Sequence, residues 1–159
     1  MSEYQPLIKP LIINGWTIFA HSLFLEQLEE LIIQVENLRQ KYPQEYKQKN
    51  ATKRLAAIFK LAFNVIPQDP TLNDYRQGIT LGDEYKHWFR AKFFQQYRLF
   101  FRYHQHGKII VYAWVNEEKS KRAFQKMLES GNPPDEWNDL LKEAESETNR
   151  LEQVFKTEI

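Results

Sequence analysis

Two segments in the first half of the chain place apolar residues at helical spacing. In the first segment these residues are Phe24, Leu28, Leu31, Ile32, Val35 and Leu38, which form one stripe of an amphipathic helix. Ser22 stands where an N-cap is expected, and Tyr42-Pro43 predicts the end of this helix. The second segment, 51–66, repeats the pattern and ends at Pro67. We therefore expect two N-terminal helices within about 22–66 that form a hairpin and cover another layer.

The period of the pattern then changes from that of a helix to that of a strand. In 88–93 (WFRAKF) and 98–103 (RLFFRY), apolar and cationic residues alternate, which predicts two strands that each have an apolar side and a cationic side. Residues 108–115 are apolar on both sides, as expected of a central strand. Helical patterns resume after Asn116 and continue to the end of the chain.

This order of elements predicts an α+β fold within one domain, residues 1–159. We expect two N-terminal helices packed on a small antiparallel sheet at about 79–116, followed by C-terminal helices at about 119–155. The length of 159 residues favours a single core over two.

Composition excludes several classes of protein. The chain has no cysteine, so disulfide scaffolds, zinc-thiolate sites and thiol nucleophiles are excluded. No apolar run approaches the length of a membrane span, and the N-terminus lacks the pattern of a secretory signal. Four unclustered histidines do not make a metal site, so we expect neither metal nor cofactor. These features fit a cytoplasmic protein.

The net charge of +1 conceals a strongly basic segment. Residues 86–122 contain 9 basic and 2 acidic side chains, a balance of +7, and residues 123–159 have a balance of −5. The basic segment predicts attraction to a polyanion, and the acidic tail from Glu143 to Glu158 is expected to offset part of it.

Four cations of this segment fall on one side of the two alternating strands: Arg90, Lys92, Arg98 and Arg102. Trp88 and Phe100 lie between them, whereas the opposite side, including Phe89, Phe93, Leu99 and Phe101, is expected to be buried. One interpretation is a solvated sheet face. The other is a platform that binds phosphates through cations and stacks bases on aromatic rings.

Several longer motifs resemble the YhaV family of type II toxin–antitoxin toxins. They are YRLFFRY at 97–103, IIVYAWVN at 109–116, NGW at 14–16, NATK at 50–53 and GNPPDEW at 131–137. The resemblance covers roughly residues 13–145. It implies a RelE-like fold, an mRNA interferase that inhibits translation, possible action on the ribosome-bound message, and a PrlF-like antitoxin of the swapped-hairpin type. It also assigns the Arg of the Tyr97-Arg98-Leu99 strand to the scissile phosphate.

The chain departs from this family after Ala123. Relatives continue with a segment of about ten residues that contains Tyr-Gly, whereas here Phe124 follows at once. The family places C-terminal catalytic groups near this point. The alternative to an active endoribonuclease is therefore a catalytically impaired RNA-binding relative, or a detoxified variant, that still binds its antitoxin.

Metal-free RNA cleavage through the 2′-hydroxyl needs a base, a group that stabilises the phosphorane, and an acid. Arg98 suits the second task, with Arg90 or Arg122 as a second clamp. Three candidates for the base remain open: Lys92, whose cationic neighbours favour its neutral form, His87 and Glu118. Further RNA contacts are expected from Arg102, Trp88, Lys119 and Arg122.

Overall fold

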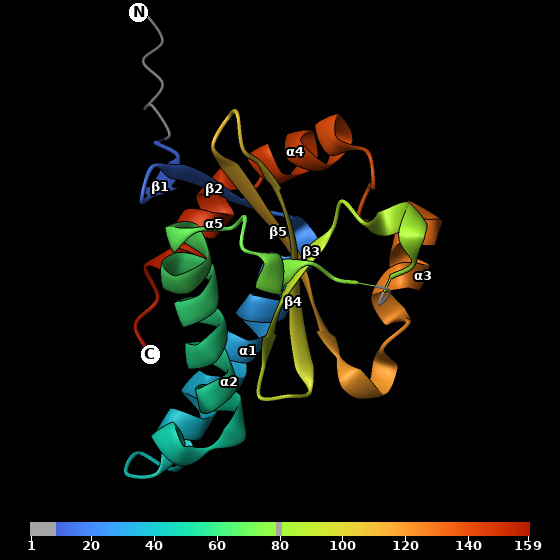
Figure 1. Ribbon diagram of the computed structural model, residues 1–159. Coiled ribbons are helices and arrows are strands. Elements are labelled where there is room, and N and C mark those ends of the chain that lie inside the picture. Colours follow the sequence, from blue (N-terminus) through green and yellow to red (C-terminus); the bar gives the residue numbers. More distant parts are fainter. Residues whose placement is uncertain (1–8, 79–80) are drawn as a thin grey trace, which may run out of the picture.

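The computed structural model describes residues 9–78 and 81–159, and its central element is a five-stranded sheet (Figure 1). The strands are β1 (Leu11–Ile13), β2 (Trp16–Ala20), β3 (Phe89–Phe93), β4 (Tyr97–His104) and β5 (Ile109–Glu117). Their order across the sheet is β1-β2-β5-β4-β3. Neighbouring strands are antiparallel except β2 and β5, which run parallel. The sheet is therefore mixed, and not purely antiparallel as we expected.

Helices cover both faces of this sheet. The first face packs against α1 (Ser22–Lys41), α2 (Asn50–Lys60) and α5 (Thr148–Phe155), and the second against α3 (Ala123–Ser130) and α4 (Trp137–Glu145). A π-helical turn, Leu61–Val65, continues α2, and short 3-10 turns lie at Tyr46–Gln48, Ile66–Gln68, Asn73–Tyr75, Asp83–Tyr85 and Glu118–Ser120. Within the described ranges, no helix is long and apolar enough to cross a membrane.

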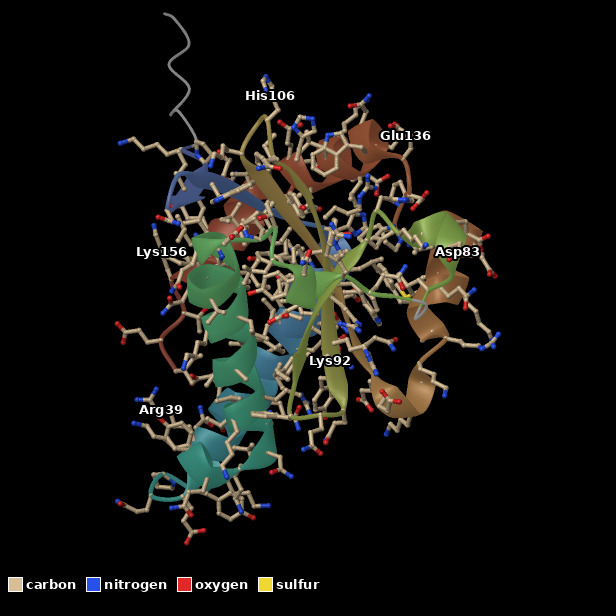
Figure 2. The ribbon with its side chains drawn as sticks, viewed as in Figure 1. Arg39, Asp83, Lys92, His106, Glu136 and Lys156 are labelled. Carbon is tan, nitrogen blue, oxygen red and sulfur yellow. The ribbon has the colours of Figure 1, made fainter. Side chains whose placement is uncertain are left out.

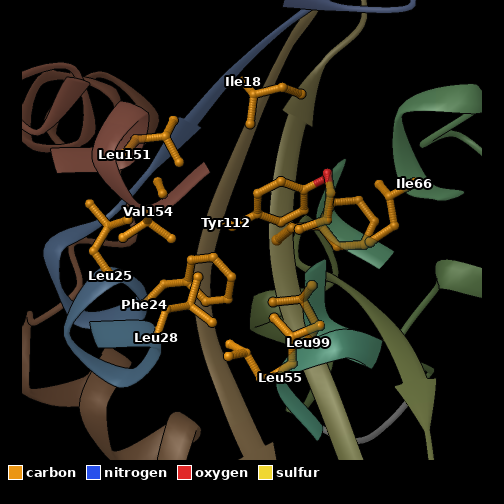
Figure 3. Packing of buried hydrophobic residues seen from close by; sticks show 14 of the residues in the cluster. Ile18, Phe24, Leu25, Leu28, Leu55, Ile66, Leu99, Tyr112, Leu151 and Val154 are labelled. Atoms are coloured by element: carbon orange, nitrogen blue, oxygen red, sulfur yellow. The ribbon is translucent and has the colours of Figure 1, made fainter. Parts of the chain in front are cut away.

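The larger core lies between the first face of the sheet and α1, α2 and α5. Figure 3 shows Phe24, Leu28 and Leu55 packed against β4 and β5, with Leu151 of α5 beside them. All are essentially inaccessible to solvent, and each such side chain contributes about 1.5–3 kcal/mol when fully buried. The predicted helical stripe from Phe24 onward is thus confirmed as the core-facing side of α1.

A second, smaller core lies on the other face. Phe100 stacks on Phe124 of α3 with ring centroids 4.7 Å apart, and Trp88 meets Phe124 edge-on at 5.1 Å. Leu140 and Ala144 of α4 complete this core. The expectation that this side of the sheet faces solvent is therefore wrong over most of its area.

The two predicted N-terminal helices exist, but two strands precede them. Trp16–Ala20 is too short for a period to be visible, and it is buried on both sides because Ile18 enters the first core and Phe19 the second. The predicted start of the sheet at 79–80 lies outside the described residues, and the hairpin of the sheet begins at Phe89.

Two of the C-terminal helices expected at about 119–155, α4 and α5, pack on opposite faces of the sheet. The chain forms a turn between α4 and α5 around Ser146, where the Ser146 hydroxyl donates to the carbonyl of Glu143 (2.6 Å). This break lets Leu140 of α4 enter the second core while Leu151 of α5 enters the first. One straight helix could not reach both faces of the sheet.

Candidate nucleic-acid interface

Three cations of the β3–β4 hairpin point to the same face of the sheet. Lys92 lies directly opposite Arg98, and Arg90 lies opposite Phe100, so all four residues share a face. Strands alternate their side chains, so Phe89, Ala91 and Phe93 occupy the other face. We call Arg90, Lys92 and Arg98 the cationic cluster. Figure 2 shows Lys92 toward the lower end of the hairpin.

Arg98 forms an ion pair with Glu118, which follows directly after β5. The Arg98 side chain is 13% exposed, and the Glu118 carboxylate is 46% exposed. The hydrogen bond from Arg98, followed by its charge and those of Lys121 and Lys92, lowers the pKa of Glu118. This shift is opposite in direction to the one a general base at neutral pH requires. Glu118 is therefore an ionised partner of Arg98 in this structure.

The cationic cluster also contains buried polar atoms without a hydrogen-bond partner. They are Nε of Arg90 and Nε of Arg98, and Oδ1 of the adjacent Asn116 is likewise without a partner. Asn116 lies directly opposite Arg98 in β5 and is 1% exposed. Burial, together with the charge of Arg98, lowers the pKa of Arg90. Buried donors usually find partners, so two guanidinium groups with free Nε–H groups form an arrangement suited to an oxyanion.

Asn116 is a polar residue of this site that the sequence did not single out. Its position in an apolar strand, after Val115, was the only available signal. This end of β5 extends beyond its pairing with β2, and the Gln27 side chain of α1 closes the free edge by donating to the Val115 carbonyl (2.9 Å) and accepting from the Val115 amide (2.8 Å). The helix α1 thereby holds the strand that carries Asn116.

His87 is not brought together with Arg98. Its Nε2 lies 2.6 Å from Oδ1 of Asp135, at the opposite end of β3 from Lys92. Lys92 lies five positions after His87, and the strand from Phe89 to Lys92 alone spans about 10 Å at ~3.3 Å per residue. Figure 2 shows Lys92 and Glu136, the neighbour of Asp135, at different ends of the sheet. Of the three proposed bases, the geometry brings Lys92 and Glu118 to the cationic cluster.

Trp88 and Arg102, both expected to contact RNA, are built into the second core. Trp88 is fully buried and its Nε1 donates to Asp135 (2.7 Å). The Arg102 guanidinium lies 5.3 Å from the Trp88 ring and 5.4 Å from the Trp137 ring, and it donates to the carbonyl of Asp135. Burial lowers the pKa of Arg102, and the charge of Asp135 opposes that shift. Trp88 and Phe100 offer no free surface, so the expected stacking platform is wrong for these two rings, and Arg102 is half-buried between the two indoles.

Lys119 and Arg122 lie on the segment that joins β5 to α3. Both side chains are exposed, and Lys119 pairs with Glu117 at 3.2 Å. Their segment begins at Glu118, the partner of Arg98. They are close in sequence to Glu118, which pairs with Arg98 of the cationic cluster.

The family model of a toxin with endonuclease activity, of a toxin–antitoxin system, matches residues 18–145. The chain belongs to the YhaV toxin family. This match includes all of β3, β4 and β5, and therefore the whole cationic cluster. By family, this protein is a toxin with endonuclease activity, as the sequence motifs predicted.

Individual YhaV proteins agree with this assignment. The ribonuclease toxin YhaV of Escherichia coli is 38% identical over 148 residues, which cover 86% of this chain and 96% of the relative. The toxin YhaV of Escherichia coli O157:H7 has the same identity and coverage. No solved structure matches the chain.

The coverage also bears on the predicted missing segment. A share of 86% of 159 residues is about 137 residues, aligned with 148 residues of the relative. About ten residues of the relative, as the difference of 148 and about 137, therefore have no counterpart in this chain. This number agrees with the shortening that the sequence motifs indicate.

Proposed function

We propose that this protein is an endoribonuclease that cleaves mRNA without a metal ion and thereby inhibits translation. The observation that carries the proposal is the pair of buried, unpartnered Nε atoms of Arg90 and Arg98 on one face of the hairpin. Two guanidinium groups with free donors suit the phosphate of a nucleic acid, because planar N–H donors match phosphate oxygens. The printed name of the Escherichia coli relative, a ribonuclease toxin, favours RNA as the substrate.

The proposed reaction uses the ribose 2′-hydroxyl as the nucleophile. The 2′-hydroxyl loses its proton as its oxygen forms a bond to phosphorus, and the bond from phosphorus to the 5′-oxygen breaks. The leaving 5′-oxygen takes a proton from water, so the products carry a 2′,3′-cyclic phosphate and a 5′-hydroxyl. Negative charge grows on the phosphoryl oxygens in the transition state. Arg98, held by β4 between Lys92 and Asn116, is the group we assign to stabilise this charge, with Arg90 as a second clamp.

Lys92 is our candidate for the proton transfer at the 2′-oxygen. Its side chain is exposed and lies across the strand pair from Arg98, so both can reach one nucleotide. Glu118 has a different proposed role. Its carboxylate forms an ion pair with the Arg98 guanidinium in the free protein, and the RNA phosphate takes the place of this carboxylate when RNA binds.

The family implies an antitoxin partner. We propose a PrlF-like regulator of the swapped-hairpin type that covers the cationic cluster and so blocks access of RNA to Arg98. Action on mRNA, free or on the ribosome, places the toxin in the cytoplasm.

A second candidate function follows from the shorter chain. The missing residues fall where the family resemblance places C-terminal catalytic groups, so a catalytically impaired RNA-binding protein that still binds its antitoxin is the alternative. Both candidates need the cationic cluster, and they differ only in turnover.

Incubation of the purified protein with mRNA tests the proposal. We expect cleavage that persists in EDTA and leaves 2′,3′-cyclic phosphate ends, measured by primer extension and end-group analysis, with and without translating ribosomes. RNA binding without cleavage under either condition would support the alternative. A protein that neither binds nor cuts RNA would contradict both.

A further inference from the structure

We propose that a hollow between α2 and the β3–β4 turn, on the far side of the hairpin from Arg98, is a second RNA subsite. It would bind a nucleotide that flanks the phosphate held by the cationic cluster, and it therefore rests on the proposed function. The hollow has a volume of about 340 Å³ and is lined by Asn50, Lys53, Arg54, Phe94, Gln96 and Tyr97. This volume falls within the ~300–1,000 Å³ typical of small-ligand sites.

The ring of Phe94 is exposed at the edge of this hollow. This side chain is 48% exposed at the tip of the hairpin, in a backbone conformation with φ of 51°, followed by Gln95 at 63°. Positive φ at both positions is typical of tight hairpin turns, where Asn and Gly are preferred. A large aromatic residue gains nothing from this geometry and little from burial here. Its placement is explained by a partner that covers it.

The rings of Phe93 and Tyr97 form an aromatic ladder next to Phe94. The rings of Phe93 and Tyr97 stack at 5.2 Å, and Phe93 meets Phe94 edge-on at 5.6 Å. Arg54 of α2 lies 5.5 Å above the Tyr97 ring and donates to its hydroxyl (3.1 Å). The ladder and Arg54 thus form a preorganised wall on which the free face of Phe94 can accept a base.

The residues that line the hollow carry a net positive charge. Lys53 and Arg54 are cationic, Asn50 and Gln96 are amides, and no carboxylate is among the described lining residues. The cations suit a phosphate and the amides suit base edges, since an amide both donates and accepts. A neighbouring hollow that shares Arg54 is lined by Glu30 and Glu117 and lacks this complementarity.

The hollow lies at the turn of the hairpin that carries the cationic cluster. Phe94 lies two residues beyond Lys92, or about 7 Å along the strand, which matches about two stacked nucleotides at ~3.4 Å each. The amide of Glu118 donates to the Gln96 carbonyl, so the turn touches the segment that carries the partner of Arg98. Figure 1 shows this turn between α2 and the segment that enters α3. A single strand that rounds the tip of the hairpin would contact both places.

Equilibrium binding of RNA tests the subsite apart from catalysis. The probe is a fluorescein-labelled single-stranded RNA of mixed sequence with 2′-O-methyl riboses, which binds without being cut. We expect Phe94→Ala to raise the Kd for this RNA by about tenfold to a hundredfold, the usual effect of losing one stacked base. Phe94→Trp should retain the affinity, and the fluorescence of the added indole should be quenched by the RNA. Lys53→Gln should reduce the log–log salt slope by about 0.7.

Phe155→Ala is the matched control. Phe155 is likewise an exposed aromatic residue (39%) that meets one ring edge-on, that of Phe63, and it lies on α5. If Phe94→Ala binds RNA as well as Phe155→Ala does, the subsite is refuted while the proposed function stands. Normal RNA binding together with a weakened antitoxin complex would assign the surface to a protein and also refute it. Absence of RNA binding by the unmodified protein would refute both proposals.

Discussion

Arg98 combines a charged partner with an unpaired buried donor. Glu118 forms an ion pair with the Arg98 guanidinium, while Nε of Arg98 has no hydrogen-bond partner. Arg102, four residues further along the same strand, is engaged by Trp88, Trp137 and the Asp135 carbonyl. The two arginines share a face of β4 but differ in what covers them.

Replacement of Arg98 separates charge from geometry. Arg98→Lys keeps the charge but loses the bidentate fork, so RNA binding should survive while the cleavage rate falls by about 10²–10³, or roughly 2.7–4 kcal/mol. Arg98→Ala should reduce both. Single-turnover cleavage and anisotropy titrations measure the two effects. If the Arg98→Lys variant cleaves RNA at the parental rate, Arg98 is not a catalytic residue. If the unmodified protein does not cleave RNA, the same substitutions are tested in a relative that carries the missing segment.

Glu118→Gln is expected to raise RNA affinity by about two- to fivefold, because a neutral amide competes less well for Arg98 than a carboxylate does. It should also change the pH dependence of stability. The pKa of Glu118 is lowered in the folded protein, so its ion pair stabilises the fold above the ordinary carboxyl value of 4.5 and loses that effect as the pH falls below it.

Urea unfolding of both proteins across this pH range measures the effect. The difference in unfolding free energy between the unmodified protein and Glu118→Gln should shrink below about pH 4.5. A difference that stays constant with pH would show that the carboxylate does not stabilise the fold through Arg98.

At the scale of the element, α1 begins at a buried histidine that also holds α4. His21 is 1% exposed and its Nδ1 accepts from the amide of Leu23 (3.2 Å). That acceptor role leaves the proton on Nε2, which donates to Glu143 of α4 (2.7 Å). One side chain therefore caps α1 and connects it to a helix on the other face of the sheet.

Substitution of His21 tests the two roles. His21→Asn retains an N-cap acceptor and loses the contact with Glu143, whereas His21→Ala loses both. We expect His21→Ala to be less stable than His21→Asn by about 1 kcal/mol, the usual worth of an N-cap. Thermal unfolding measures the difference, with Glu143→Gln as a control that keeps an acceptor on α4. Equal stabilities of the two His21 variants would argue against the cap.

At the scale of the whole molecule, α5 carries the later part of the acidic C-terminal segment on the other side of the sheet from Arg98, whereas Glu143 and Glu145 belong to α4 on the second face. α5 packs in the larger core through Leu151 and Val154, and Arg150 is bound to Glu29 of α1 (2.6 Å). The hydrogen bond and charge of Glu29 raise the pKa of Arg150. The sheet therefore separates the α5 part of this segment from the cationic cluster. Removal of α5 would expose the core.

The cations that remain accessible determine the salt dependence of RNA binding. Each phosphate contact contributes a log–log slope of about −0.7 on a single strand, so Arg90, Lys92, Arg98 and Lys53 together predict roughly −2 to −3. Arg102→Gln should leave that slope unchanged while lowering the melting temperature, since Arg102 is packed between two indoles. A flat titration would mean that the cationic cluster faces no phosphate, and a smaller slope in Arg102→Gln would place Arg102 in the interface.

Local pattern determined those parts of the protein whose elements are long or strictly alternating. The stripe from Phe24 to Leu38 was sufficient for α1, and the alternation in β3 and β4 correctly placed Lys92 and Arg98 on one face, with Leu99 and Phe101 beneath. These periods follow from backbone geometry, which every residue of an element shares. The motifs of the YhaV family were likewise contained in the sequence.

Tertiary packing alone decided what covers each face. Alternation assigns Trp88, Phe100 and Arg102 to the side of Arg98, but packing with α3 and α4 then buries Trp88 and Phe100, and the Asp135 carbonyl engages Arg102, whereas Arg98 keeps an unpartnered Nε. Likewise, Trp16–Ala20 becomes a strand because β5 offers it a parallel edge. Burial depends on which distant segments meet, and the free energy of those contacts is absent from any local window of the chain. The sequence therefore determined the longer elements and the family, and the fold determined which cations stay open to solvent.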